Sequence, residues 1–310
     1  MRHPRTRQPR VPELPEVESV RRGLAPRVVG NTVLDVAILR DYSIRHQVGG
    51  AQEFRDRLVG STLCEVARRG KFLWMTARKD GSAPVALVAH LGMSGQFRFF
   101  ENEARPLHPH ARVTMLLGSG ASRTELDFID QRTFGYLVVD DVIGTSDHLA
   151  AGAGTGAALI PRRVSHIARD ILDPHFDIDA VAGSLRTRSS AIKSLLLGQQ
   201  TVSGIGNIYA DEALWRARVH PAQSARQISS EKMRLVLESA AAVMAAALEV
   251  GGTSFDALYV NVNGESGYFS RSLQAYGRTG EPCPRCGTPI RRIVVGGRSS
   301  HICPRCQRRR

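Results

Sequence analysis

The sequence is short of acidic residues and contains no long apolar run. Its apolar stretches stay well below the ~20 residues that a membrane-spanning helix requires, so we expect no membrane partner. Residues 1–10 are basic and lack the apolar core of a secretory signal peptide. Only 29 Asp and Glu oppose 42 Lys and Arg, which gives a net charge of +13. This excess favours a polyanionic partner, nucleic acid first and an anionic membrane surface second, without distinguishing DNA from RNA.

The sequence has only five cysteines, and four of them form two closely spaced pairs near the C-terminus. Cys283 and Cys286 are the first pair, and after sixteen intervening residues Cys303 and Cys306 are the second. Without a signal peptide, such pairs indicate metal ligands in a reducing cytoplasm rather than two structural disulfides. Four thiolates suit tetrahedral Zn²⁺ and leave no open coordination position, so we expect one structural zinc ion. The isolated Cys64 is expected to be a small core residue of a strand.

The chain divides into a strand-rich half and a helix-rich half. Short strand-like segments predict an antiparallel sandwich or barrel, at residues 32–39, 62–67, 72–77, 85–90, 96–100, 113–117, 125–128 and 136–139. Residues 144–161 are rich in Gly, Ala and Thr and predict a linker or mobile loop. Helical spacing follows, at residues 177–188, 191–199, 207–218 and 230–250. We therefore expect an α+β fold.

Residues 11–18, Val-Pro-Glu-Leu-Pro-Glu-Val-Glu, combine two prolines and three carboxylates directly before an apolar run at helical spacing. The run ends at Gly30, which places Glu16 and Glu18 in a first helical turn, where acidic side chains suit the helix dipole. Most such clusters are only helix starts. A proline that begins a chain, however, carries a secondary amine whose pKa near ~8 leaves far more of it unprotonated than a lysine. Such an amine is a good nucleophile, and Glu13 is placed to handle a proton.

Two stretches carry a resemblance to a known family. Residues 12–18, followed by Arg-Arg-Gly-Leu at 21–24, resemble the opening of the formamidopyrimidine-DNA glycosylases, bacterial enzymes that excise oxidised purines from DNA. Residues 202–211, Val-Ser-Gly-Ile-Gly-Asn-Ile-Tyr-Ala-Asp, resemble the helix–two-turn–helix of the same family. The resemblance implies an N-terminal β-sandwich, then a helical domain and a zinc finger, with DNA in the cleft between them. In the family the proline follows the initiator Met, so we expect Val11 to mark the true start of the protein.

The resemblance also implies a role for each motif residue. Pro12 attacks the deoxyribose C1′ of a flipped nucleotide, and Glu13 assists opening of the sugar ring. Lys71 and Arg298 donate protons during strand cleavage. The residues implied to contact DNA are the wedges Met93 and Phe134, Arg132 opposite the orphaned base, and the phosphate ligands His110 (in preference to His108), Arg188, Lys193 and Asn207. Residues 261–269 match the family's lid over the flipped base.

We expect a mis-annotated extension at residues 1–11 and a catalytic helix with the β-sandwich at 12–143. A linker at 144–172 then leads to the helix–two-turn–helix domain at 173–274 and the zinc finger at 275–310. The implied function is base-excision repair by a bifunctional glycosylase and abasic-site lyase. Its implied partner is double-stranded DNA that contains 8-oxoguanine, formamidopyrimidines or abasic sites. We expect a monomer in the bacterial cytoplasm, associated with the nucleoid through DNA.

Two alternatives stay open. An enzyme of the endonuclease VIII type uses the same proline and glutamate on oxidised pyrimidines, although the wedge residues and the lid segment favour the purine enzyme. If residues 1–11 are translated and retained, the protein is instead a non-catalytic binder of damaged DNA, because an internal proline has no free amine.

Overall fold

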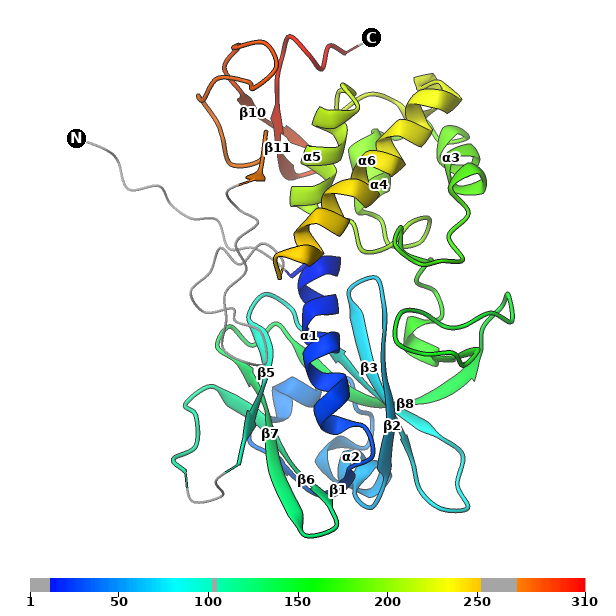
Figure 1. Ribbon diagram of the computed structural model, residues 1–310, viewed down its shortest axis with the longest axis vertical. Helices are drawn as coiled ribbons and strands as arrows, with labels where there is room; N and C mark the ends of the chain where they lie inside the picture. Colours follow the sequence, from blue (N-terminus) through cyan, green and yellow to red (C-terminus); the bar gives the residue numbers. More distant parts are fainter. Residues whose placement is uncertain (1–11, 102–104, 252–271, 310) are drawn as a thin grey trace, which may run out of the picture.

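The structure is a computed structural model that describes residues 12–101, 105–251 and 272–309. Figure 1 shows a β-rich half below, a helical half above it, and a two-stranded finger beside the helical half. The expected extension at residues 1–11 and the expected lid at residues 261–269 lie outside the described residues. None of the helices in the described ranges is long and apolar enough to cross a membrane.

The β-rich half is a nine-stranded antiparallel sheet that is nearly divided in two. Its strands follow the order β5-β7-β6-β1-β2-β3-β4-β8-β9. The bounds are β1 (Thr32–Ile38), β2 (Thr62–Arg69), β3 (Phe72–Arg78), β4 (Val85–His90), β5 (Gly95–Phe100), β6 (Ala111–Ser119), β7 (Ser122–Asp130), β8 (Tyr136–Gly144) and β9 (Leu159–Pro161). Strands β1 and β2 share the single register pair Thr32 and Thr62, whereas β8 and β9 share three pairs and the other neighbours share more. The sheet therefore forms two layers, which confirms the expected sandwich.

Helix α1 (Leu14–Val28) lies between the two groups of strands and shares one core with them and with α2 (Gly50–Leu58). Its buried apolar side chains recur at helical spacing, at Val17, Val20 and Leu24. They meet residues from both groups of strands, including Val36, Leu73, Leu87, Phe97, Met115 and Phe128. Complete burial of one such side chain is worth roughly 1.5–3 kcal/mol, so this core holds α1 firmly in place.

The helical half is built on a second core. Its helices are α3 (Ile178–Arg186), α4 (Ile192–Leu197), α5 (Asn207–Arg216) and α6 (Ser230–Glu249). Short 3-10 helices in the described part of the chain include η1 (Asp41–Ile44), η2 (Arg162–Val164) and η3 (Ala225–Gln227). Asp177 and Ser229 cap α3 and α6 by accepting backbone N–H groups. Leu14, the first residue of α1, is buried in this second core. The N-terminal end of α1 is therefore anchored in the helical half and the rest of it in the β-rich half.

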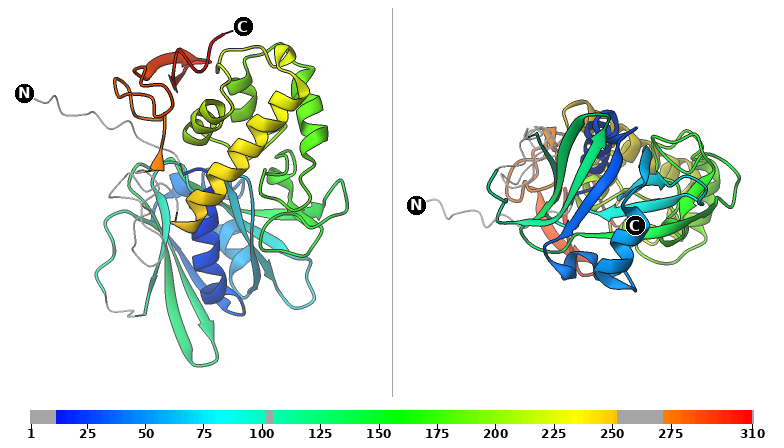
Figure 2. Two further views of the ribbon diagram at one scale, coloured as in Figure 1. Left: turned by 45° about the horizontal axis from the view of Figure 1, so that its top comes forward. Right: turned by 90° about the horizontal axis from the view of Figure 1, so that it is seen from below.

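The finger is a hairpin of β10 (Arg291–Val295) and β11 (Arg298–Ile302), and the left view of Figure 2 places it beside the upper helices. Its small core contains Cys283, Ile290 and Cys303 together with Trp215 of α5. The finger is thus packed onto the same helix whose beginning faces α1.

Residues 144–161, expected to be a linker or mobile loop, are in part an ordered edge of the sheet. Strand β9 pairs with β8, and Ala153 pairs with Arg68. A Cβ at Gly152 would lie 2.2 Å from the Arg68 carbonyl oxygen, so the small residues of this segment serve close backbone packing. Cys64 also differs from the expectation, because it is exposed. The register of β2 shifts between Leu63 and Glu65, and this bulge turns Cys64 outward.

Candidate active site and zinc centre

The carboxylate of Glu13 lies at the positive end of α5. Its Oε1 accepts the backbone N–H of Ile208 at 3.1 Å, and its Oε2 accepts that of Tyr209 at 3.5 Å. Gly206 makes this approach possible, since a Cβ there would lie 2.1 Å from the Glu13 Cδ. The absence of a side chain at Gly206 therefore lets a protein carboxylate reach the N-terminus of α5.

The environment of Glu13 favours its protonated form. Burial raises the pKa of Glu13 to about 7, against the opposing charge of Lys71, and the nearby Glu16 raises it further. The amides of Ile208 and Tyr209 stabilise the carboxylate, but not enough to offset its desolvation. A carboxyl with a pKa near neutrality is suited to give and take a proton at physiological pH.

Glu16 fixes the chain that carries Pro12 and Glu13. Its Oε2 accepts the Glu13 N–H at 2.9 Å, and its Oε1 accepts the Tyr209 hydroxyl at 3.1 Å. The backbone N–H of Leu14 donates to the Gly204 carbonyl at 3.3 Å. Pro12 itself is buried. The start of α1 is thus tied to the turn before α5 through Gly204 and to α5 itself through Tyr209.

Lys71 follows a tight turn between β2 and β3 that the neighbouring carboxylates hold. Gly70 has φ of +58°, and its N–H donates to Asp170 Oδ2 at 3.1 Å. Arg68 donates to the same Asp170 oxygen at 2.8 Å and to Glu18 Oε2 at 2.9 Å. Arg68 is only 2% exposed, so this basic turn is a buried network rather than a solvated surface.

The charges of Glu13 and Arg298 both act on Lys71. Burial lowers the pKa of Lys71, the carboxylates of Glu13 and Glu16 raise it, and the guanidinium of Arg298 lowers it. Arg298 is exposed at the first position of β11. Three of the four residues expected to carry chemistry thus lie in one electrostatic neighbourhood, and Pro12 is the chain neighbour of Glu13.

Lys193 differs from its expected place on a DNA-facing surface. Its side chain is fully buried, and its Nζ donates to Asp211 Oδ1 at 2.6 Å, to the Ser299 carbonyl at 2.7 Å and to Ser300 Oγ at 2.8 Å. The other Asp211 oxygen accepts the His301 N–H at 2.8 Å. The ammonium group therefore ties α4 to α5 and to the finger, because a buried cation must be paired.

The expected wedge residues lie on two loops that touch each other. Met93 is half-buried, and Phe134 has 52% of its side chain exposed. The Arg132 guanidinium lies 5.5 Å from the centre of the Phe134 ring. His110 is half-buried, with its Nδ1 3.4 Å from Arg112 Nη2. The two loops place an apolar and a cationic side chain together at the surface.

The expected phosphate ligands of the helical half remain accessible in different degrees. Arg188 is exposed just after α3. Asn207 is the first residue of α5 and half-buried, and its side-chain NH₂ group and the helix N-terminus are the groups that can donate to a phosphate. Both sit where a phosphate oxygen could be bound, Asn207 at a helix N-terminus.

Sequence reasoning missed several buried carboxylates. Asp170 holds the Lys71 turn, Asp211 holds the finger, and Glu212 accepts the backbone N–H groups of three consecutive residues, Gln274, Ala275 and Tyr276. For Asp211, the last residue of the ten-residue motif, and Glu212, which follows it, a signal was available, because acidic residues in an otherwise apolar helix need partners.

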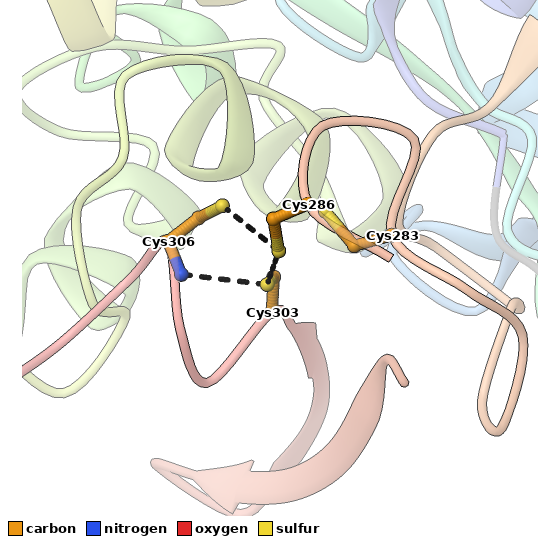
Figure 3. A group of neighbouring side chains, drawn as sticks. All are labelled: Cys283, Cys286, Cys303 and Cys306. Carbon is orange, nitrogen blue, oxygen red and sulfur yellow. Dashed lines mark hydrogen bonds between the residues drawn. The ribbon is translucent and has the colours of Figure 1, made fainter. Parts of the chain in front are cut away.

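The four cysteines of the finger form a compact cluster (Figure 3). Their ligand atoms all lie within 4.8 Å of one another, and Cys286 Sγ lies 3.4 Å from Cys303 Sγ and 3.5 Å from Cys306 Sγ. Zn–S bonds of about 2.3 Å in a tetrahedron require sulfur separations of this size. The donor set and its spacing therefore fit one zinc ion, as the sequence predicts.

Three family profiles match the chain. The N-terminal domain of formamidopyrimidine-DNA glycosylase matches residues 11–137, its H2TH domain matches residues 167–258, and a zinc finger found in FPG and IleRS matches residues 280–309. Formamidopyrimidine-DNA glycosylase from Corynebacterium glutamicum (strain R) is 48% identical over 97% of this chain and all of the relative. That from Mycobacteroides abscessus is 50% identical over 96% of this chain and 98% of the relative.

Solved structures agree with these matches. Lactococcus lactis Fpg in complex with an abasic site containing DNA is 31% identical, with a TM-score of 0.77 over 96% of this chain and all of that one. MutM (Fpg) protein from Thermus thermophilus is 35% identical over the same shares, with a TM-score of 0.76. A two-layer sheet, a helix–two-turn–helix and a four-cysteine finger define the same class of protein. This chain belongs to the formamidopyrimidine-DNA glycosylase family.

Proposed function

We propose that this protein is a DNA glycosylase and abasic-site lyase of base-excision repair that removes 8-oxoguanine and formamidopyrimidines from double-stranded DNA. The observation that carries the proposal is Glu13, a buried carboxyl with a pKa of about 7 beside Lys71 and next to Pro12 in the chain. Two similar solved structures, a mutant of Lactococcus lactis FPG with a Fapy-dG containing DNA and MutM with carbocyclic 8-oxo-G containing DNA, support the choice of substrate.

The proposed reaction begins at the nitrogen of Pro12. A free secondary amine attacks C1′ of a flipped nucleotide, and the N–C1′ bond forms as the base leaves with the electron pair of the glycosidic bond. The proton that the amine loses passes to the departing base. Glu13 gives its proton to the ring oxygen as the C1′–O4′ bond breaks, which leaves an iminium cation on C1′. The iminium acidifies the C2′ proton, and its loss expels the 3′ phosphate. A second elimination expels the 5′ phosphate, with Lys71 and Arg298 as the proposed proton donors.

The proposed DNA contacts follow the charge and shape of the surface. Arg188, Asn207 and His110 bind phosphates, and the net charge of +13 makes the affinity fall steeply with salt. Met93 and Phe134 enter the space that the flipped base leaves, and Arg132 faces the orphaned base. The buried Lys193 is not among the proposed contacts, because its ammonium is fully paired inside the protein. The zinc ion holds the finger that presents Arg298 and takes no part in the chemistry.

The proposal requires a free amine at Pro12. In the 310-residue sequence the nitrogen of Pro12 belongs to an amide bond with Val11 and cannot attack carbon. We therefore propose that the working protein begins at Pro12. The match of the N-terminal family profile begins at residue 11, which supports this start.

Borohydride trapping tests the proposal directly. A protein that begins at Pro12 is compared with the full 310-residue chain, each verified by mass, on DNA that contains 8-oxoguanine. We expect the shortened form to be reduced onto the DNA as a covalent adduct and the full chain to bind without being trapped. Pro12→Gly in the shortened form keeps a primary amine and is expected to retain weak trapping.

Three outcomes would change the assignment. Equal trapping of both forms means that the nucleophile is another amine, with Lys71 the first candidate. Trapping of the shortened form only on oxidised pyrimidines would identify an enzyme of the endonuclease VIII type. Damage-specific binding without any trapping, in both forms, would leave a non-catalytic binder of damaged DNA.

A further inference from the structure

The two wedge loops both cross between the layers of the sandwich. The loop at residues 91–95 leads from β4 in one group of strands to β5 in the other, and the loop at residues 131–135 leads back from β7 to β8. The two groups are joined along the sheet by the β1–β2 pairing, on the path between β6 and β3. The wedge loops are therefore a second connection between the layers. The position of one loop relative to the other depends on the contacts between the two loops.

A buried serine and a buried aspartate connect the two loops. Ser94 Oγ donates to Asp130 Oδ1 and accepts the backbone N–H of Arg132 at 3.0 Å. The other oxygen of Asp130 accepts the N–H of Gly135 at 2.7 Å. Ser94 is 2% exposed and Asp130 is fully buried. Because Ser94 and Asp130 are buried away from water, losing any one of these hydrogen bonds leaves a polar group unpaired at a high cost. We therefore expect the three hydrogen bonds to form and break together.

The loops are also in direct backbone contact. A Cβ at Gly92 would lie 2.4 Å from the Gly135 nitrogen and 2.5 Å from the Phe134 carbonyl carbon, so only glycine fits at this place. Met93, the next residue, is therefore carried by a backbone that rests on the backbone of Phe134. The two backbones therefore touch at Gly92, and the hydrogen bonds of Ser94, Asp130 and Arg45 hold them in this contact.

Arg45, from the end of η1, holds the second loop from outside. Its Nη1 donates to the Gly135 carbonyl at 2.8 Å, and its Nη2 donates to the Phe134 carbonyl at 3.0 Å. Gly135 is thus bound at its nitrogen by Asp130 and at its oxygen by Arg45. The ring of Phe134 remains 52% exposed on this fixed backbone, which is the arrangement of an apolar side chain presented to a partner.

We propose that Ser94, Asp130 and Arg45 lock the two loops into one rigid wedge, so that Met93 and Phe134 enter DNA as a single unit. This inference rests on the proposed function, in which both side chains fill the space left by the flipped base. A wedge that is already formed before binding does not have to order its backbone when it meets DNA, and so avoids that entropic cost. Ser94, Asp130 and Arg45 are positioning residues, since they act through the side chains that touch DNA.

Coupling between the two wedges measures the lock. In the protein that begins at Pro12, the rates of excision from damaged duplex are compared for Met93→Ala, Phe134→Ala and the double variant under single-turnover conditions. If the wedge acts as one unit, the double variant is expected to be slowed little more than either single variant. In a Ser94→Ala background the loops move separately, so the two losses are expected to multiply. Ser94→Thr keeps the hydroxyl and is expected to restore the coupling.

Arg45→Ala is a second way to loosen the lock, in case Ser94→Ala disturbs folding. Arg45 lies at the surface side of the loop and contributes no core side chain, so the variant is expected to fold normally and to weaken the coupling partly. Multiplying losses in the native background, or full coupling in both the Ser94→Ala and Arg45→Ala backgrounds, would overturn the inference.

Hydrogen exchange separates failure of the lock from failure of the proposed function. The amide protons of Arg132 and Gly135 are expected to be protected together in the native protein and to lose protection together in Ser94→Ala, whether or not the protein cleaves DNA. Gly135 keeping its protection while Arg132 alone exchanges would contradict the lock. A native shortened protein that shows the shared protection but excises no oxidised purine would instead contradict the proposed function.

Discussion

Glu13 and Glu18 lie at the same end of the chain and are almost equally buried, at 4% and 3% exposed, yet their acidities differ widely. Burial raises the pKa of Glu13 to about 7. Burial alone would raise that of Glu18 as well, but the hydrogen bond from Arg21 and the charge of Arg68 outweigh it and lower the pKa to about 2. Burial alone does not decide whether a carboxylate stays ionised or titrates near neutral pH. The hydrogen-bonding and charged groups around the carboxylate decide its pKa.

The two halves of the protein supply different partners. Glu13 faces the helical half, which offers the backbone amides of Ile208 and Tyr209. Glu18 faces the β-rich half, where the guanidinium of Arg68 joins it to Asp170. Amides leave the carboxyl able to titrate near neutrality, whereas paired guanidiniums keep it ionised. Helix α1 therefore carries toward one half a carboxyl that titrates near neutrality, and toward the other a carboxylate that stays ionised until the pH is strongly acidic.

Removal of zinc is expected to have the largest effect on DNA binding. It should disturb only the helical half, which Glu13 faces, and leave the β-rich half unchanged. Chelation releases the finger, which presents Arg298 and is tied to α5 through Lys193 and Asp211, so damaged-DNA binding should be lost. The chain has two tryptophans, one in each half, and they report on the two sides separately.

Tryptophan fluorescence after chelation is the measurement. Trp215 packs beside Cys283 and Cys303 and should change its emission, while Trp74, buried against the β-rich half, should not. Trp215→Phe and Trp74→Phe assign the two signals. An active protein without bound zinc, or a change in the Trp74 signal at the same chelator concentration, would argue against a finger that folds on zinc independently of the sandwich.

Glu13→Gln in the protein that begins at Pro12 is expected to have the next largest effect. The amide keeps the shape of the carboxyl but cannot donate a proton to the sugar ring, so base excision should fall by roughly 10²–10⁴-fold. DNA binding should be retained, and the native rate should decline above pH 7 as Glu13 ionises. Excision rates measured from about one pH unit below this pKa to two units above it check the prediction. A native profile that stays flat through pH 7 and a nearly active variant would both contradict the role of Glu13.

The overall plan of the molecule was predictable from the sequence. All eight expected strands are observed, because alternating apolar residues and turn residues mark a half-buried sheet. Strands β1 to β7 begin and end close to the expected bounds, whereas β8 continues to Gly144 and β9 was not expected. The helix that begins at Leu14 and the helix that begins at Asn207 also lie where helical spacing and glycines placed them. The cysteine spacing predicted the zinc centre, because two chelating pairs make a tetrahedral site regardless of what lies between them.

Many contacts between distant residues were not predictable. No local pattern identifies the partners of Arg68, because Glu18 and Asp170 are far away from it in the sequence. Lys193 was placed at the DNA surface because its helix was, although only the folded chain brings Asp211 and Ser299 to its ammonium. A single sequence records which residues are charged. Which charges meet depends on the packing of the two halves, and no local pattern encodes that.

The pH dependence of stability sharpens the comparison further, with an effect on the order of 2–3 kcal/mol. The pKa of Glu13 is raised from its usual 4.5 to about 7, so its contribution is fully present below pH 4.5 and is lost as the pH rises toward 7. The pKa of Glu18 is lowered to about 2, so its contribution is present above pH 4.5 and is lost as the pH falls toward 2. The two carboxylates therefore limit stability at opposite ends of the pH range.

Urea unfolding of Glu13→Gln and Glu18→Gln at about pH 3, 5 and 8 separates these windows. Glu13→Gln should gain stability relative to the native protein between the two higher pH values, because the variant has no buried group to ionise. Glu18→Gln leaves the buried Arg68 with Asp170 as its remaining ionic partner and should be less stable by roughly 3 kcal/mol at the highest pH. That deficit should shrink toward the lowest pH, where the native Glu18 pair begins to break. Parallel stability curves for the two variants would mean that both carboxylates are held in the same way, and the contrast between the two halves would fail.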